Sequence, residues 1–305
     1  MSSQQPQQEH KLYHGVVVPM VTPFTSDGKL DEQATIRIVD HLLIAGVAGV
    51  FVLGTTGEDA SMPPAMRSRL VRLTAERVAG RAIVYAGISH NCLVASTDAA
   101  REYRELGADV LVARLPTYYA LDGSEQLAYF RTLLKRIPGP LMLYNISSTT
   151  HMTIPVDVVE RLSEEPKVVG IKDSDADLDR LEQLVRGVGQ RSDFSVLVGV
   201  TSLSAKALKL GADGIVPSPG NLVPDLCQQL YESAKNGEDR LAEDYQQRLN
   251  DVGSLIRGNR SLGQSLGRLK AAMSSRALCG PFVLPPLVTL DRTEQKAVER
   301  LLLDW

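Results

Sequence analysis

The chain has 305 residues, of which 44% are hydrophobic and 23% charged, and its formal net charge is −3. This apolar fraction is too high for a disordered chain, and the lack of a basic excess argues against nucleic acid as a partner. No uncharged apolar stretch is long enough to span a membrane and the start of the chain lacks an apolar signal core, so we expect a cytoplasmic protein.

After a polar tail predicted for residues 1–12, short apolar runs alternate with longer amphipathic segments. Nearly continuous apolar runs are typical of strands buried on both faces of a parallel sheet. The predicted strands are residues 15–18, 49–53, 82–86, 110–113, 140–145, 168–171, 195–198 and 214–216. The predicted helices are residues 31–45, 67–78, 94–106, 125–136, 155–162, 177–188, 203–210 and 225–236.

Strict alternation of eight strands with eight helices predicts a closed (β/α)8 barrel, the TIM barrel of the α/β class. The first strand is not followed by a Gly-x-Gly-x-x-Gly turn, which disfavours an open dinucleotide-binding sheet. Beyond the last predicted strand and helix, the periodicity stays helical. We therefore expect a barrel over residues 13–236 and a C-terminal helical region over residues 237–305.

The cysteines and histidines indicate no metal centre. Cys92, Cys227 and Cys279 are widely spaced, so we expect buried free thiols in a reducing compartment. The five histidines show no ligand spacing, which disfavours zinc chemistry. We expect neither a metal nor another cofactor.

Active sites of such barrels lie at the carboxyl ends of the strands. Lys172 directly follows the sixth predicted strand and should point its amine into the barrel mouth. One interpretation is a structural lysine paired with Asp173 or another acid. The other is an amine nucleophile, in which apolar walls favour the uncharged amine that condenses with a ketone.

Other strand ends supply polar groups to the same mouth. Gly54, Thr55 and Thr56 open a glycine-flanked turn whose N–H groups suit a carboxylate or a phosphate, although such a turn can also be only a turn. Tyr144 ends the fifth strand, where a phenol can shuttle protons or simply pack, and Tyr119 follows the fourth. The combination favours a Schiff-base site over coincidence.

Four motifs in order and spacing resemble the dihydrodipicolinate synthase/N-acetylneuraminate lyase family of class I aldolase-type barrels, over nearly the whole chain. They are Val-Thr-Pro-Phe at 21–24, Gly-Thr-Thr-Gly-Glu at 54–58, Tyr-Asn-Ile at 144–146 and Val-Gly-Ile-Lys-Asp-Ser at 169–174. The resemblance implies that Lys172 forms an imine with C2 of pyruvate or another 2-keto acid. Backbone N–H groups of Thr55 and Thr56, with the Thr56 hydroxyl, would hold the carboxylate.

The resemblance further implies that Tyr144 shuttles protons and that Thr55 links it to Tyr119 from a neighbouring subunit. A homotetramer built as a dimer of dimers is therefore expected. The backbone at Gly199 and Ile215 would line the same pocket. No cofactor is needed, because the protonated imine is itself the electron sink.

Departures from the family pattern bear on the substrate. Synthases read Tyr-Asn-Val/Ile-Pro-Ser-Arg-Thr-Gly, whereas this chain has Ser147 for the proline, Thr149 for the arginine and His151 near the glycine. In the synthase that arginine holds the second substrate's carboxylate, and a threonine cannot replace a bidentate guanidinium. Arg114 could reach the mouth and compensate, or could face the helices.

The leading interpretation is a lyase acting on a 2-keto-3-deoxy sugar acid or related 2-keto acid, by retro-aldol cleavage to pyruvate or by dehydration. A true dihydrodipicolinate synthase is second and a sialic acid lyase third. A barrel that binds keto acids without catalysis is the main non-enzyme alternative. Glycines after the seventh and eighth strands keep a phosphate-binding barrel as a weaker alternative.

Overall fold

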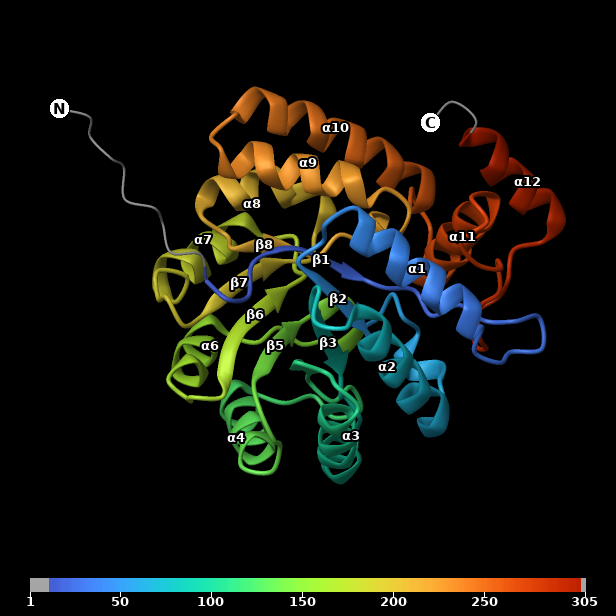
Figure 1. The fold of residues 1–305 in the computed structure, drawn as a ribbon. Coiled ribbons are helices and arrows are strands. Elements are labelled where there is room, and N and C mark those ends of the chain that lie inside the picture. The colour runs from blue at the N-terminus through green and yellow to red at the C-terminus, as the bar shows by residue number, and fades with distance from the viewer. Residues whose placement is uncertain (1–10, 303–305) are drawn as a thin grey trace.

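Eight parallel strands close into a barrel in the computed structural model, which describes residues 11–302. Each strand pairs with the next in the sequence, and β8 returns to β1 through Gly15 opposite Gly214 (Figure 1). The strands are β1 (Gly15–Pro19), β2 (Gly49–Val52), β3 (Ile83–Gly87), β4 (Val110–Arg114), β5 (Leu141–Asn145), β6 (Val168–Asp173), β7 (Ser195–Val198) and β8 (Gly214–Ile215). The predicted TIM barrel is confirmed.

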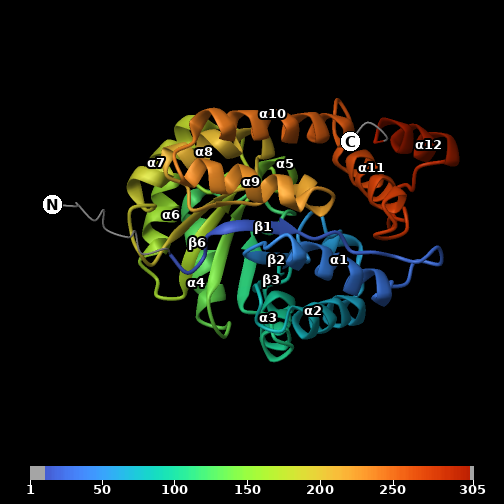
Figure 2. The same cartoon turned by 45° about the horizontal axis from the view of Figure 1, so that its top comes forward.

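Helices surround the barrel, as expected when both faces of the strands are apolar (Figures 1 and 2). Those of the βα units are α1 (Glu32–Ile44), α2 (Pro64–Val78), α3 (Leu93–Glu105), α4 (Gly123–Leu134), α6 (Val156–Ser163), α7 (Leu178–Gly187), α8 (Ser204–Leu210) and α9 (Pro224–Lys235). Each lies where the periodicity predicts a helix. The one-turn helix α5 (Ser147–Thr150) was not predicted, since four residues are too short for a periodic pattern.

Six of the eight strands end one or two residues away from the predicted position, and two of these differences bear on the mouth. The second strand stops at Val52 because Leu53 has a left-handed backbone with φ of 58°. The sixth strand continues to Asp173, so Lys172 lies within β6 instead of after it. Both differences change how the mouth is built, because side chains alternate between the two faces of a strand.

The core has two layers. Inward-facing side chains fill the barrel, among them Val17, Phe51, Val112, Met142 and Leu197. A larger apolar layer lies between the outer face of the strands and the helices. The barrel is therefore packed along its axis, and a ligand can enter only at an end of it.

Three further helices follow the barrel: α10 (Asp239–Ile256), α11 (Leu262–Ser275) and α12 (Arg292–Leu301). They lie together along one side, α10 against α8 and α9 (Figure 2). This agrees with the predicted helical character of the region, and its boundary at residue 237 stays a prediction. The predicted tail over residues 1–12 lies outside the described residues except for Lys11 and Leu12.

The prediction of three buried thiols is wrong for one of them. Cys227 and Cys279 are buried. Cys92 is exposed, because it is the N-cap residue of α3 and lies at the surface. No helix among residues 11–302 combines the length and the apolar character needed to cross a bilayer.

Candidate active site

The amine of Lys172 lies inside the mouth of the barrel. The residue is 6% exposed, and its Nζ lies 4.0 Å from the ring centroid of Tyr144 and 4.9 Å from that of Phe51. Among the described residues it forms no ion pair. Asp173, the partner considered for a purely structural lysine, instead pairs with Arg180 of α7, Nε to Oδ2 at 2.9 Å. Lys172 is thus a buried amine beside aromatic faces and without a carboxylate partner.

Gly199 makes room for this lysine. A Cβ atom at Gly199 would lie 3.1 Å from Cε of Lys172 and 2.1 Å from Oγ of Ser174. The residue follows β7 directly, so its backbone forms one wall of the mouth. Ile215 of β8 is fully buried and its side chain belongs to the outer apolar layer. Only the backbone of Ile215 remains for the site.

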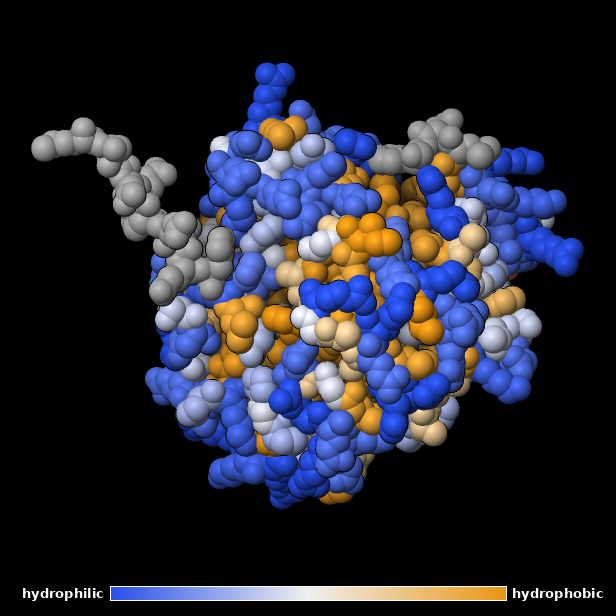
Figure 3. Space-filling model, in the orientation of Figure 1, coloured by the Kyte–Doolittle hydropathy of each residue, from blue (hydrophilic) through white to orange (hydrophobic). Residues whose placement is uncertain are grey.

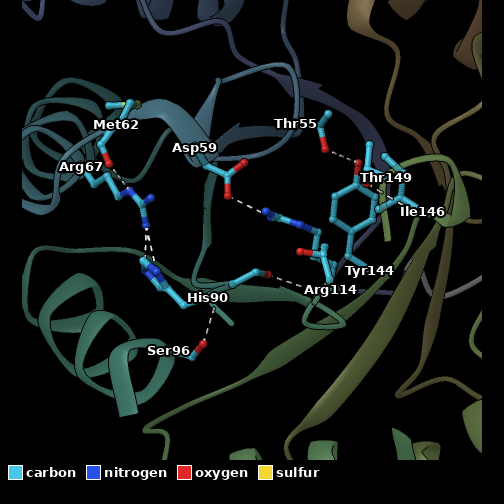
Figure 4. Close-up of polar contacts among 12 residues, drawn as sticks. Thr55, Asp59, Met62, Arg67, His90, Ser96, Arg114, Tyr144, Ile146 and Thr149 are labelled. Atoms are coloured by element: carbon cyan, nitrogen blue, oxygen red, sulfur yellow. Dashed lines mark hydrogen bonds and ion pairs between the residues drawn. The ribbon is translucent and has the colours of Figure 1, made fainter. Parts of the chain in front are cut away.

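The ring below the amine carries one member of a hydroxyl pair. Oγ1 of Thr55 lies 3.2 Å from the phenol oxygen of Tyr144, and both residues point into the mouth from different strand ends (Figure 4). The Tyr144 ring packs edge-on against Phe51, with centroids 6.1 Å apart. This packing fixes the ring, so the phenol is held between Thr55 and Lys172.

The turn after β2 presents backbone N–H groups. A Cβ at Gly54 would lie 2.8 Å from the Phe51 ring, so only glycine fits where the turn begins. The amides of Thr55 and Thr56 donate to no acceptor among residues 11–302, while Oγ1 of Thr56 lies 3.0 Å from Oγ of Ser218. Two free N–H groups beside a hydroxyl suit a carboxylate.

A buried ion pair holds the end of this turn. Glu58, in a left-handed conformation, pairs with Lys270 of α11 and accepts a hydrogen bond from the Leu284 amide at 2.8 Å. Burial raises the pKa of Glu58, and the positive charge of Lys270 opposes that shift. Lys270 of α11 and the Leu284 amide thereby fix the turn after β2. The sequence analysis missed the ion pair because Glu58 and Lys270 lie far apart in the chain.

Tyr119 is not part of the site formed by one chain. It is 72% exposed, stacks edge-on against Tyr118 with centroids 5.0 Å apart, and has no hydrogen bond among the described residues. The structure of one chain therefore does not bring it to Thr55.

Arg114 already has a partner. Its Nη1 lies 2.9 Å from Oδ2 of Asp59, with the two side chains 14% and 7% exposed (Figure 4). Its guanidinium is therefore not free for a substrate. Thr149, beside Tyr144 in Figure 4, bonds weakly to the Ile146 carbonyl through Oγ1 at 3.4 Å. The mouth thus offers a hydroxyl where the synthase pattern has an arginine.

A carboxylate that the sequence analysis did not select anchors the loop carrying Thr149. Asp175 accepts hydrogen bonds from Asn145 Nδ2 at 2.9 Å, Thr153 Oγ1 at 2.9 Å and both N and Oγ of Ser147. A proline at position 147 could not donate that backbone bond. The sequence contains both partners, Ser147 in place of a proline and an acid three residues after Lys172. Nothing in the sequence shows that the loop after β5 contacts the loop after β6.

Within residues 11–302, no group of three or more histidine, cysteine or acidic side chains could hold a metal ion. The chemistry available at the mouth is that of an amine, a phenol, hydroxyls and backbone amides. Such a set can condense with a carbonyl, hold a carboxylate and move protons.

Comparisons with known proteins give relatives over nearly the whole chain. The profile of the dihydrodipicolinate synthetase family matches residues 12–304. An uncharacterized DapA-like lyase of Halobacterium salinarum is 31% identical over 291 residues, covering 95% of this chain and 93% of that protein. The dihydrodipicolinate synthase structure from Bacteroides thetaiotaomicron has a TM-score of 0.91 at 31% identity, covering 96% of this chain and 98% of its own. YagE, a prophage protein of the dihydrodipicolinic acid synthase family from E. coli K12 solved with pyruvate, has a TM-score of 0.90 at 26% identity, covering 96% and 98%.

Proposed function

Because the chain belongs to the dihydrodipicolinate synthetase family and is a lyase, we propose that it acts on pyruvate or a 2-keto-3-deoxy sugar acid through an imine on Lys172. The reaction is aldol cleavage or addition, or dehydration. The observation that carries the proposal is the buried amine of Lys172 beside Tyr144, without an acidic partner among the described residues. YagE, which was solved with pyruvate, supports a 2-keto acid as the ligand.

In the cleavage direction, the amine of Lys172 adds to C2 of the keto acid. The phenol of Tyr144 gives its proton to the hydroxyl that leaves C2 as water, which yields the protonated imine and a phenolate. The phenolate then takes the proton from the C4 hydroxyl, and the C3–C4 bonding electrons move into the imine. An aldehyde leaves and an enamine remains. Protonation at C3 and addition of water then release pyruvate and the free amine.

The other mouth residues hold the substrate and move protons. The amides of Thr55 and Thr56 and the Thr56 hydroxyl bind the carboxylate next to C2, within the turn begun by Gly54. Thr55 hands protons between Tyr144 and Tyr119 of the partner subunit. The exposure of Tyr119 in one chain is consistent with such an exchange.

The second part of the substrate carries hydroxyl groups. Thr149 and Ser174 offer hydroxyls, and Arg114 is held by Asp59. A substrate with a second carboxylate would lack the bidentate partner that makes such sites tight. We therefore favour a sugar acid over the synthase reaction.

The synthase reaction is the second candidate. The comparison that favours it is the 31% identity to the Bacteroides thetaiotaomicron synthase over nearly the whole of both chains. In that reaction the enamine would add to an aldehyde that carries a carboxylate, and Thr149 would bind it poorly. Two activity assays separate the candidates. A sugar-acid lyase should cleave or dehydrate a 2-keto-3-deoxy sugar acid, whereas a synthase should condense pyruvate with an aldehyde that carries an amino group and a carboxylate. A barrel that only binds keto acids would show neither activity.

The first experiment is to trap the imine. The protein is incubated with pyruvate, reduced with borohydride, and examined by intact mass and peptide mapping. We expect one reduced pyruvate per chain, on the Lys172 peptide, and none in Lys172→Ala. The exposed Lys206→Ala serves as the matched control and should be labelled like the wild type. Labelling of Lys172→Ala to the same extent would overturn the mechanism.

The assembly and location remain predictions. The family resemblance implies a homotetramer built as a dimer of dimers, in which Tyr119 is exchanged between two subunits. A cytoplasmic location is expected from the family and the composition. The division into a barrel over residues 13–236 and a helical region over residues 237–305 is likewise a prediction.

A further inference from the structure

A fully buried pair of opposite charges joins α11 to the turn after β2. The side chains of Glu58 and Lys270 are both 0% exposed and form an ion pair. Lys270 Nζ also donates to the Phe282 carbonyl at 2.8 Å and lies 4.1 Å from the centroid of the Phe24 ring. Figure 3 shows mainly hydrophilic side chains over α12, the outermost C-terminal helix, whereas α11 buries every residue from 265 to 273. Water therefore solvates neither charge, and each depends on the other.

Stability alone does not explain why two charges are buried here. Taking both from water costs free energy that their attraction often repays only in part, and apolar side chains of similar volume are often as stable. Other ion pairs, such as Arg69 with Glu32, lie at the surface, where the charges stay partly hydrated. The place of Glu58 at the end of the turn after β2 points instead to a role in holding that turn.

The ion pair holds a residue with an unfavourable backbone. Glu58 is left-handed, with φ of 57° and ψ of 34°, a conformation that costs free energy when a side chain is present. Its Oε2 accepts a hydrogen bond from the Leu284 amide at 2.8 Å, and its Oε1 pairs with Lys270. Both carboxylate oxygens are thus held by the C-terminal part of the chain. These contacts keep Glu58 in a conformation that its own backbone disfavours.

The conformation of Glu58 determines where the amides of the turn point. Its N–H donates to the Thr55 carbonyl at 3.2 Å, and the N–H of Gly57 donates to the Gly54 carbonyl at 3.0 Å. In a trans peptide group the N–H points away from the carbonyl of the same group. Because the Thr55 carbonyl points into the turn, the N–H of Thr56 points out of it. The Gly54 carbonyl fixes the N–H of Thr55 in the same way.

We propose that Lys270 is a positioning residue for the substrate. Through Glu58 it orients the amides of Thr55 and Thr56 toward the carboxylate of the 2-keto acid, although it lies below the turn and touches no reacting atom. This role rests on the imine chemistry proposed for Lys172. Loss of the ion pair should weaken the grip on the carboxylate and leave the amine of Lys172 in place.

Pyruvate and pyruvamide test this role, because they share a ketone and differ in the charge of the group beside it. The rate of reductive labelling at Lys172 is measured with each ligand and cyanoborohydride, and each rate is divided by that of free Nα-acetyl-lysine to remove differences in ketone reactivity. Partial unfolding lowers both rates alike and leaves their ratio unchanged. The wild type should prefer pyruvate by about 10-fold or more, as expected for a charge-assisted contact.

A neutral replacement of the ion pair is the decisive variant. Lys270→Met alone leaves Glu58 buried and unpaired, which can unfold the chain. Glu58→Gln/Lys270→Met buries no charge and keeps an acceptor for the Leu284 amide, and its preference for pyruvate should fall by about 10-fold. Lys11→Met is the matched control. It breaks the ion pair of Lys11 with Asp213, which precedes β8 at the opposite end of the barrel, and should keep the wild-type preference.

The outcomes separate this role from the reaction on which it rests. Absence of label on Lys172 of the wild type with either ligand would mean that the imine chemistry itself fails. A wild type that is labelled without preference would overturn both the carboxylate contact of the turn and the role of Lys270. If the double variant keeps the wild-type preference, or if Lys11→Met loses it to the same extent, the ion pair only stabilises the fold.

Discussion

The phenol of Tyr144 combines packing and proton transfer in one side chain, and the two roles can be separated. Its ring lies against Lys172 and Phe51, while its oxygen meets Thr55. Removing the oxygen leaves the packing intact. At the scale of single residues, this position therefore gives the clearest test of the proton relay.

Tyr144→Phe should lower kcat by about 10²-fold or more, the usual effect of losing a general acid–base group. The free energy of unfolding should change by only about 1 kcal/mol, the worth of one hydrogen bond. Steady-state kinetics and urea denaturation measure the two effects. Tyr245→Phe, outside the mouth, is the matched control, and a wild-type kcat in Tyr144→Phe would show that the phenol moves no proton.

Neighbouring elements position the substrate through loop-to-loop contacts. Asp175, after β6, holds the loop after β5 and with it the helix α5 that carries Thr149. Burial alone would raise the pKa of Asp175, but hydrogen bonds from Ser147, Asn145 and Thr153 outweigh it and lower the pKa. This anchor should therefore act only while the carboxylate is charged.

Asp175→Asn should destabilise the fold by about 1–3 kcal/mol at pH 7, as expected for bonds to a charged acceptor. Because the folded-state pKa lies below the unfolded one, this stabilisation is present above about pH 4 and is lost as the pH falls through the folded pKa. Urea denaturation at pH 7 and at about pH 3 compares the two proteins. The difference should shrink on acidification, and Asp179→Asn on the exposed face of α7 should show no such trend.

The proposed proton relay from Tyr144 through Thr55 to Tyr119 needs more than one subunit. Tyr119 is exposed and bonds to nothing in the described part of its own chain, although the proposed relay needs it beside Thr55. A second subunit that places its own Tyr119 there would bury this side chain. Assembly would then be a condition for catalysis and not only for stability.

Mixing two inactive variants tests this exchange. A dimer of one Lys172→Ala and one Tyr119→Phe subunit has one site with both an intact lysine and the intact Tyr119 of the partner subunit. Random reassociation should restore about a quarter of the wild-type activity, since half the dimers are mixed and each has one working site of two. Activity no higher than the sum of the two separate variants would mean that Tyr119 acts within its own chain or not at all.

Local pattern was enough to predict the barrel and the meeting of three side chains at its mouth. Apolar runs and amphipathic periods depend on neighbours in the chain, and strand ends of a barrel share one face, so Lys172, Tyr144 and Thr55 could be expected together. What the tertiary structure decided are contacts between distant segments: Glu58 with Lys270, and Asp175 with the loop after β5. Such pairings depend on how loops and added helices pack, which no local period encodes.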